Sequence, residues 1–215
     1  MSENLIETSY NITGKSKIRN FYDKYKIIIF SIFSIALVII ALISFYFKNE
    51  ENKKIILSEN YISAKLYIKN QNKDKAREIL KDIVLKKDRT YSALALFLIL
   101  DENLMKEKKE LINLFNYAIE TKPIDKELKN LIIFKKMLYQ ADYSSEVDLL
   151  ETAKKLINTE TIWKPNALLL IADYFVSKKE YSKAKEFYSK VLLLKNIHKD
   201  IHEYSAYQLA NISNE

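Results

Sequence analysis

The same apolar pattern recurs four times along the chain, and this recurrence limits the fold more than any other feature of the sequence. Each copy places apolar or small residues at positions i, i+3, i+4, i+7 and i+8, which form one face of an α-helix. The copies begin at residues 76, 111, 149 and 184, so they lie 35, 38 and 35 residues apart, and Thr152 takes one apolar place. A fixed period of this size is typical of a helical repeat array.

A second apolar helix pattern precedes the first and the last copy, across a short polar turn. Ala64 stands 12 residues before Ala76, and Ala172 stands 12 residues before Ala184. Each unit is therefore predicted to be a pair of antiparallel helices. Any helical bundle produces such stripes, but the shared step of 12 residues favours repeated pairs. The two middle pairs are helical and apolar as well, about one turn out of register.

The composition agrees with a helical chain whose turns do not depend on glycine. The 215 residues include one glycine and two prolines, too few for the many tight turns of a β-meander. Polar residues fill the turns instead, and Asp74 and Ser182 are the predicted N-caps of the helices that follow two of them.

The helix pairs resemble tetratricopeptide repeats. That family places a small residue and then an aromatic residue in the first helix, and a small residue and then a bulky one in the second. The matching residues are Ala64, Tyr67, Ala76 and Leu80 in the first pair and Ala172, Phe175, Ala184 and Tyr188 in the last, with Phe115, Ala118 and Pro123 matching the end of another pair. The resemblance implies an all-α repeat array over residues 55–215. It would hold about four helix pairs and a capping helix that packs through Tyr204, Tyr207 and Leu209.

A run of 21 residues without a charge, residues 27–47, lies near the N-terminus. As a helix it would be about 31 Å long, close to the thickness of a bilayer's hydrocarbon core. A buried core helix would need protein around it, and a cleaved signal peptide would have a shorter apolar core. The sequence predicts a short cytoplasmic tail (1–26), a transmembrane helix (27–47), a charged linker (48–54) and the repeat domain (55–215).

The charges flanking this run favour one orientation slightly. Five basic residues stand within about 20 residues before the run and four stand after it, which favours a cytoplasmic N-terminus. Residues 48–215 carry 30 basic and 25 acidic residues, since residues 1–47 hold 5 of the 35 basic and 3 of the 28 acidic ones. Only residues 19, 77 and 89 are arginine. Nucleic-acid recognition favours clustered arginine, so no nucleic-acid binding is predicted.

The sequence predicts no enzymatic activity, no metal and no cofactor. His198 and His202 stand four residues apart and could face a metal together. No glutamate fills the place between them that a zinc protease requires, so we interpret them as two surface histidines. There is no cysteine, no glycine-rich phosphate loop and no nucleophile motif. Trp163, with Pro165 near the start of a helix, is predicted to pack between neighbouring pairs.

A protein without catalytic residues and with a repeat array is expected to bind other proteins in a groove lined by the first helices of the pairs. From helical phase, the candidate groove residues are Asn60, Lys65, Lys69, Tyr174, Lys178 and Lys179. A groove lined by lysine would favour acidic or carboxylate-bearing partners.

The order of tail, apolar run, charged linker and repeat domain resembles the ancillary subunits of the SecYEG translocon, the YfgM-like proteins, most closely over residues 161–193. The resemblance implies a single-pass protein of the bacterial inner membrane with a periplasmic repeat domain. Its expected partners are translocon subunits, exported polypeptides or periplasmic chaperones, for which it would be a chaperone-like adaptor. The alternative function is a structural scaffold of another envelope complex, in division or outer-membrane assembly.

Overall fold

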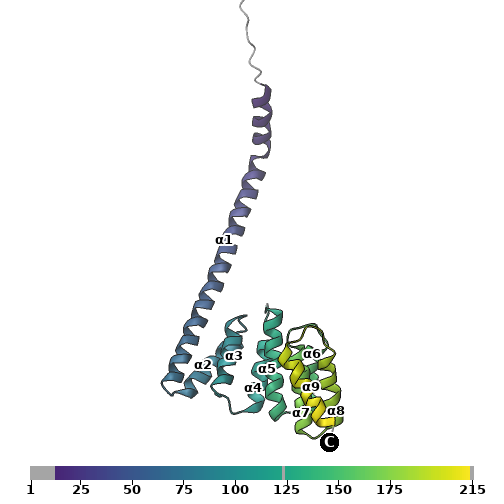
Figure 1. Cartoon of the computed structure of the whole chain (residues 1–215). Coiled ribbons are helices and arrows are strands. Elements are labelled where there is room, and N and C mark those ends of the chain that lie inside the picture. The colour runs from purple at the N-terminus through teal and green to yellow at the C-terminus, as the bar shows by residue number, and fades with distance from the viewer. Residues whose placement is uncertain (1–12, 123, 214–215) are drawn as a thin grey trace, which may run out of the picture. The chain divides into compact units, whose positions relative to one another are not determined.

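The computed structural model describes residues 13–122 and 124–213, and these residues form nine α-helices and no strand (Figure 1). The helices are α1 (Thr13–Lys69), α2 (Lys73–Leu85), α3 (Tyr91–Asp101), α4 (Lys108–Glu120), α5 (Lys126–Tyr143), α6 (Glu146–Ile157), α7 (Lys164–Ser177), α8 (Tyr181–Leu192) and α9 (Lys199–Ser213). The all-α prediction is confirmed.

The contacts divide the chain into two units, residues 1–54 and residues 55–215. We call the second the helical unit. The boundary falls inside α1, so the charged segment 48–54 is helical rather than extended. Of the predicted tail, residues 13–26 also belong to α1, and residues 1–12 lie outside the described residues.

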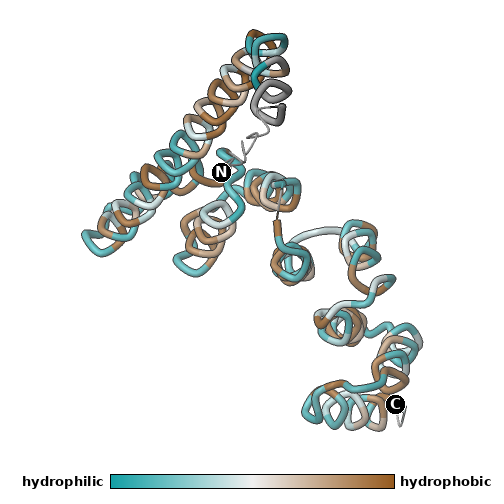
Figure 2. Tube along the Cα trace, turned by 90° about the horizontal axis from the view of Figure 1, so that it is seen from above, coloured by the Kyte–Doolittle hydropathy of each residue, from teal (hydrophilic) through white to brown (hydrophobic). Residues whose placement is uncertain are grey.

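From α2 to α9, successive helices contact one another, and Figure 2 shows them following each other in a zigzag. The four predicted stripes face the core. Their most deeply buried members are Ala76, Leu80, Ile83, Val84, Phe115, Ala118, Leu149, Ala153, Leu156, Ala184 and Val191, each with no exposed surface. The stripe that begins at Leu168 is buried as well, so the helical phase read from the sequence is confirmed.

The four alanines that set the step of 12 residues have no exposed surface. Ala64 and Ala76 belong to one core cluster, and Ala172 and Ala184 belong to another. A methyl group at each of these places lets two helices approach closely, while larger neighbours such as Leu80 and Tyr188 fill the remaining space.

Three helices, α1, α3 and α7, end in the same turn. The residue in the left-handed conformation is Gln71, Asn103 or Lys179, with φ of 62°, 49° and 60°. The next residue donates its backbone N–H to the fifth carbonyl before it, in the pairs Asn72 to Tyr67, Leu104 to Ile99 and Glu180 to Phe175. This is the Schellman motif, built without the glycine that usually relieves the strain of the left-handed place.

The same turns explain why the predicted N-caps are wrong by two residues. The Schellman turns after α1 and α7 lead at once into the next helix, so α2 begins after Asn72 and α8 begins after Glu180. Asn72 caps α2 by accepting from the backbone N–H of Lys75 at 3.3 Å. Asp74 and Ser182 therefore lie inside the first turns of their helices.

The helix α5 differs from α3 and α7. It has 18 residues rather than 11 or 14, and it ends at Ser144 in an extended conformation rather than in a Schellman turn. It also joins the two core clusters, because Ile132 belongs to the first and Ile133 to the second. The irregular middle of the sequence therefore corresponds to the helix where the two cores meet.

The last helix, α9, covers the end of the second core cluster. Its buried side chains are Ser205 and Ile212, with Leu209 partly buried against the cluster. Tyr204 and Tyr207 are 42% and 64% exposed, so the prediction that they pack inward together with Leu209 is wrong for both tyrosines. The face of α9 that points toward the core is the one that carries Ser205, Leu209 and Ile212.

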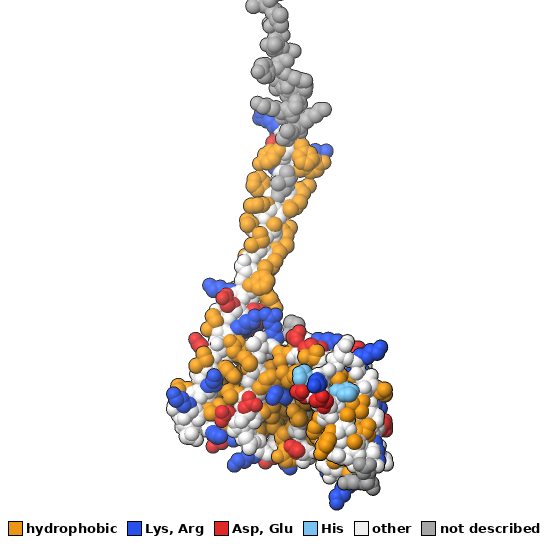
Figure 3. Space-filling model, viewed as in Figure 1, with side chains coloured by type: hydrophobic (Ala, Val, Ile, Leu, Met, Phe, Trp, Pro, Cys, Tyr) orange, Lys and Arg blue, Asp and Glu red, His pale blue; other side chains and the backbone are white. Residues whose placement is uncertain are grey.

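Polar contacts link positions about one repeat apart. Lys87 and Glu120 form an ion pair at 3.2 Å, Lys183 and Glu146 form one at 2.8 Å, and Lys81 pairs with Glu110. The partners are separated by 33, 37 and 29 residues. Charged side chains of both signs are interspersed on the visible face of the helical unit (Figure 3).

Candidate interaction site

The predicted groove residues lie on two helices that belong to different core clusters. Lys65 and Lys69 are exposed on α1, Asn60 is partly exposed there, and Lys178 and Lys179 are exposed just after α7. None of them lines either of the two pockets described below.

Tyr174, the sixth predicted groove residue, is buried, so its place on an exposed face is wrong. It is 8% exposed, and its ring meets that of Phe175 edge to face at 5.6 Å. The reason is the position of α7, which contacts α5, α6, α8 and α9 and so has little free circumference. The ammonium of Lys178 lies over the Tyr174 ring, 5.3 Å from its centre.

A pocket of about 520 Å³ lies between α4, α5 and α6, and we call it the α4–α6 pocket. Its lining comes from the first turns of α4, the last turns of α5 and one face of α6. The lining residues are Lys108, Lys109, Ile112, Asn113, Lys136, Tyr139, Gln140, Tyr143, Ser144, Asp148, Glu151, Thr152 and Lys155. The pocket therefore lies at the end of α5 that has no Schellman turn.

The cation of Lys136 is held inside this pocket. The residue is 8% exposed, and its Nζ donates to Oδ1 of Asn116 at 2.9 Å. It makes no ion pair with any other residue that the structure describes. Burial lowers the pKa of Lys136, and the nearby charge of Lys155 lowers it further, while Glu151 and Asp148 act in the opposite direction.

Gln140 is the second unusual polar residue of the pocket. It is 4% exposed, and its Nε2 donates to the backbone carbonyl of Asp148 at 3.4 Å. That contact fixes which end of the amide is the donor. Its Oε1 is buried and has no hydrogen-bond partner among the described residues. An unsatisfied buried acceptor of this kind costs about 1–3 kcal/mol.

Two tyrosines form the aromatic side of the pocket. The rings of Tyr139 and Tyr143 lie 5.0 Å apart, and Phe115 continues the row at 6.3 Å from Tyr139. The ammonium of Lys108 lies 4.2 Å from the centre of the Tyr143 ring. A cation at this distance from a ring is held by its quadrupole and fixes the first turn of α4 beside the end of α5.

A second pocket, of about 550 Å³, is lined by Glu127 of α5, the α6–α7 loop, the start of α7, the α8–α9 loop and the start of α9. Two of its polar groups, Glu127 and Thr161, are paired with each other. Oε2 of Glu127 accepts from Oγ1 of Thr161 at 2.7 Å, and Nδ2 of Asn130 donates to the same Oγ1 at 3.0 Å. These bonds tie the α6–α7 loop to α5 and make this a structural junction.

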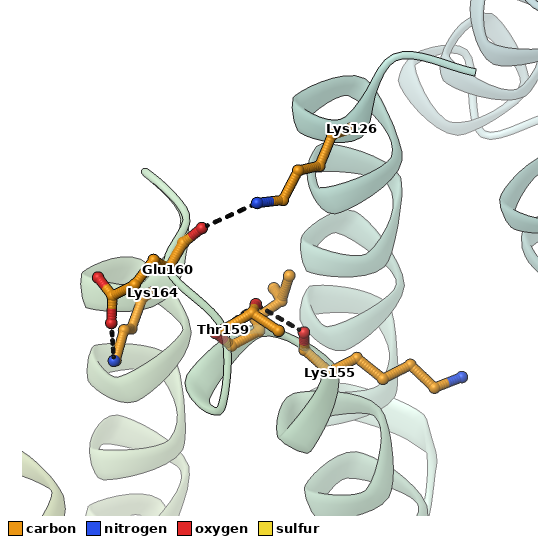
Figure 4. Close-up of polar contacts among 6 residues, drawn as sticks. Lys126, Lys155, Thr159, Glu160 and Lys164 are labelled. Carbon is orange, nitrogen blue, oxygen red and sulfur yellow. Dashed lines mark hydrogen bonds and ion pairs between the residues drawn. The ribbon is translucent and has the colours of Figure 1, made fainter. Parts of the chain in front are cut away.

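Figure 4 shows the outer part of this junction. Lys126 donates to the carbonyl of Glu160 at 3.3 Å, and the carboxylate of Glu160 pairs with Lys164 at 3.0 Å. The side chain of Lys155 points away from these residues (Figure 4), and it lines the α4–α6 pocket.

Trp163 packs between neighbouring pairs, as predicted. Its ring stacks on that of Phe134 from α5 at 5.5 Å, and Pro165 stands in the first turn of α7. The histidines His198 and His202 are exposed, and His198 lies 3.4 Å from the carboxylate of Asp200. Among the described residues there is no group of three or more side chains that could hold a metal ion.

One helix of the described chain, the part of α1 from Phe21 onward, is long and apolar enough to cross a membrane. Every described side chain from Ile27 to Phe47 is exposed. The apolar side chains cover this segment in the space-filling view (Figure 3).

Comparisons of the chain with protein-family models, with curated proteins and with solved structures found no significant match.

Sequence reasoning missed Lys136 and Gln140. Both lie on α5, in the stretch that fits the repeat pattern least well, and Lys136 follows another lysine. The sequence signal that could have found them is helical phase, because Lys136 and Gln140 lie on the same face as Ile132 and Ile133.

Proposed function

We propose that this protein is a membrane-anchored interaction protein whose helical unit binds segments of other proteins. The observation that carries the proposal is the exposure of every described side chain from Ile27 to Phe47. That many apolar side chains must be covered, and a run of this length matches a bilayer. The helical unit has core clusters of its own and leaves a pocket open.

The helical unit is proposed to be a tetratricopeptide-like array. Four helix pairs follow from the chain order, with the end of α1 beside α2, then α3 with α4, α5 with α6 and α7 with α8, and α9 caps the last pair. The buried alanines at both ends and the Schellman turns after α1, α3 and α7 support this reading. Arrays of this kind present surfaces for peptide segments.

The proposed location is a bacterial inner membrane, with the N-terminus in the cytoplasm and the helical unit in the periplasm. The slight excess of basic residues before the apolar run supports this orientation. The proposed role is a chaperone-like adaptor at the secretion translocon, as the resemblance to YfgM-like proteins suggests. Its partners would be translocon subunits, exported polypeptides or periplasmic chaperones.

Crosslinking in intact cells tests this role. Cells expressing the full chain are treated with a membrane-permeant crosslinker, and the attached proteins are identified by mass spectrometry. Recovery of translocon subunits or of polypeptides in transit is expected. Recovery of a division or outer-membrane assembly complex instead would favour a structural scaffold and contradict the adaptor role.

A reporter tests the orientation separately. A fluorescent protein that matures only in the cytoplasm is fused after residue 215, and a second fusion carries it before residue 1. Fluorescence is expected from the second fusion alone. Fluorescence from the first would place the helical unit in the cytoplasm and contradict the periplasmic role.

A further inference from the structure

We propose that the α4–α6 pocket binds an acidic peptide segment, whose carboxylate pairs with Lys136. This inference rests on the proposed function, since it names the ligand class and the residues through which the helical unit would bind.

The ammonium group of Lys136 is a buried cation in the lining of the pocket. An ammonium group has three hydrogen-bond donors, and Lys136 uses one of them on the neutral amide oxygen of Asn116. Burying a charge without an ion-pair partner is unfavourable, and an anion that enters the pocket would recover that loss. Asp148 and Glu151 lie near enough to act on this charge, but no described carboxylate forms an ion pair with Lys136, so the side chain can accept a further negatively charged partner.

The start of α4 adds positive charge to the pocket. The positive end of a helix dipole favours acidic residues, but α4 begins with Lys108 and Lys109, and both line the pocket. The N-cap residue Glu107 makes no side-chain bond to the first turn. The acidic residue of this turn, Glu110, pairs with Lys81 of α2 and does not line the pocket. Two lysines and an uncapped helix end thus lie beside the same pocket.

The side chains that line the pocket carry more positive than negative charge. Its cationic side chains are Lys108, Lys109, Lys136 and Lys155, and its carboxylates are Asp148 and Glu151. Oδ2 of Asp148 already accepts from the hydroxyl of Ser145 at 2.7 Å. The excess of two positive charges, four minus two, selects an anion over a cation or a neutral ligand.

The other groups of the pocket favour a peptide over a small free anion. Gln140 lines the pocket, and its buried Oε1 has no hydrogen-bond partner among the described residues, so a ligand that displaces this side chain would have to offer it a donor. A carboxylate cannot supply one, but the N–H groups of a peptide backbone can. The rings of Tyr139 and Tyr143 add an apolar surface beside these polar groups, and a pocket of about 520 Å³ holds several residues of an extended segment.

Fluorescence anisotropy of the full chain in detergent micelles tests the proposal. The probe is a labelled short peptide of alternating alanine and glutamate, blocked at both ends, and its matched control replaces every glutamate with glutamine. The glutamate peptide is expected to bind about tenfold or more tightly than the control, as a charge-assisted bond to a buried group predicts. Its affinity should fall as salt is raised.

Three variants locate the site. Lys136→Met keeps the unbranched shape and most of the length of the side chain and should fold, which circular dichroism checks, and it should weaken binding about tenfold. Lys155→Met changes an exposed side chain at the rim of the pocket and should weaken binding about twofold. Lys65→Met, on the face first predicted as the groove, removes an exposed charge that is not part of this lining and should leave the affinity unchanged.

Several outcomes would overturn the proposal. They are equal binding of the two peptides, binding that survives both pocket substitutions, loss of binding in Lys65→Met, and displacement of the peptide by inorganic phosphate at an equal concentration. None of these results depends on which proteins are crosslinked in cells. The adaptor role can therefore fail while the pocket binds acidic peptides. Equally, the pocket can fail to bind acidic peptides while the adaptor role holds, and the two experiments distinguish these cases.

Discussion

The hydroxyl of Tyr188 donates a 2.6 Å hydrogen bond to Oδ1 of Asp173 and so joins α8 to α7. The hydroxyl of Tyr204 from α9 reaches the same oxygen at 3.4 Å. Burial raises the pKa of Asp173, and the bonds from the two tyrosines oppose that rise. Burial and the bond to Asp173 raise the pKa of Tyr188. Three helices therefore meet at one carboxylate at the end of the array.

Replacing Tyr188 with phenylalanine tests the contribution of this bond. Tyr188→Phe removes the shorter of two bonds to a partly buried carboxylate, so the free energy of unfolding should fall by about 1–2 kcal/mol. Tyr204→Phe is the matched control. It removes a longer bond from an exposed tyrosine and should cost less than about 0.5 kcal/mol. Urea unfolding of the detergent-solubilised chain, followed by circular dichroism, measures both, and equal losses would contradict the assignment.

The raised pKa of Asp173 predicts an unusual pH dependence. The folded state binds this proton more tightly than the unfolded state, whose carboxyl titrates near pH 3.9. Between that value and the folded pKa, stability contributed by this group is therefore lost as the pH rises. Asp173→Asn should remove that component, so the difference in unfolding free energy between the two proteins should change with pH in this window. A constant difference from pH 3 to pH 7 would show that the pKa is not raised.

The close contact of the last helix pair predicts a large effect at Ala184. Ala184→Glu forces a carboxylate into a place with no exposed surface, which should cost several kcal/mol and unfold the second core cluster. Ser182→Glu, two residues earlier on the exposed side, should change the unfolding free energy by less than about 0.5 kcal/mol. Hydrogen exchange resolved along the chain measures both, and normal protection of α7 and α8 in Ala184→Glu would refute the packing.

The proposed membrane span predicts a strong response to charge within the apolar run. Each arginine at the centre of a span costs about 2.5–3.5 kcal/mol for insertion. The double variant Ile35→Arg with Val38→Arg should therefore leave the membrane fraction during an alkaline carbonate wash. The apolar pair Ile35→Leu with Val38→Ile should stay in that fraction with the original chain. Retention of the arginine variant would argue against a spanning helix.

Much of the fold could be predicted because the signal lies in helical phase. The apolar stripes around Ala76, Leu111, Leu149 and Ala184 gave both the helices and their buried faces. The N-caps could not be placed as well, because Gln71 and Lys179 adopt left-handed conformations that sequence patterns assign to glycine or asparagine. Those turns start the next helix earlier than Asp74 and Ser182 suggested.

The candidate site could not be predicted because it depends on how helices from different pairs meet. Tyr174 looked exposed from the phase of α7 alone, but four neighbouring helices surround α7. Helical phase places Lys136 on the same face as Ile132, but lysine is rarely buried, and only the arrangement of α4 and α6 beside the long helix α5 encloses it. Contacts of this kind have no counterpart in the local sequence.

The most direct test of the account is photo-crosslinking from the α4–α6 pocket in living cells. A photoreactive phenylalanine analogue is placed at Asn113, which is exposed and lines the pocket, or at Lys86, which is exposed elsewhere. Position 113 should yield crosslinked polypeptides, position 86 should yield few, and the additional change Lys136→Met should remove the products from position 113. Equal yields from both positions, or products from position 113 that persist with Lys136→Met, would contradict the claim that this pocket captures protein segments.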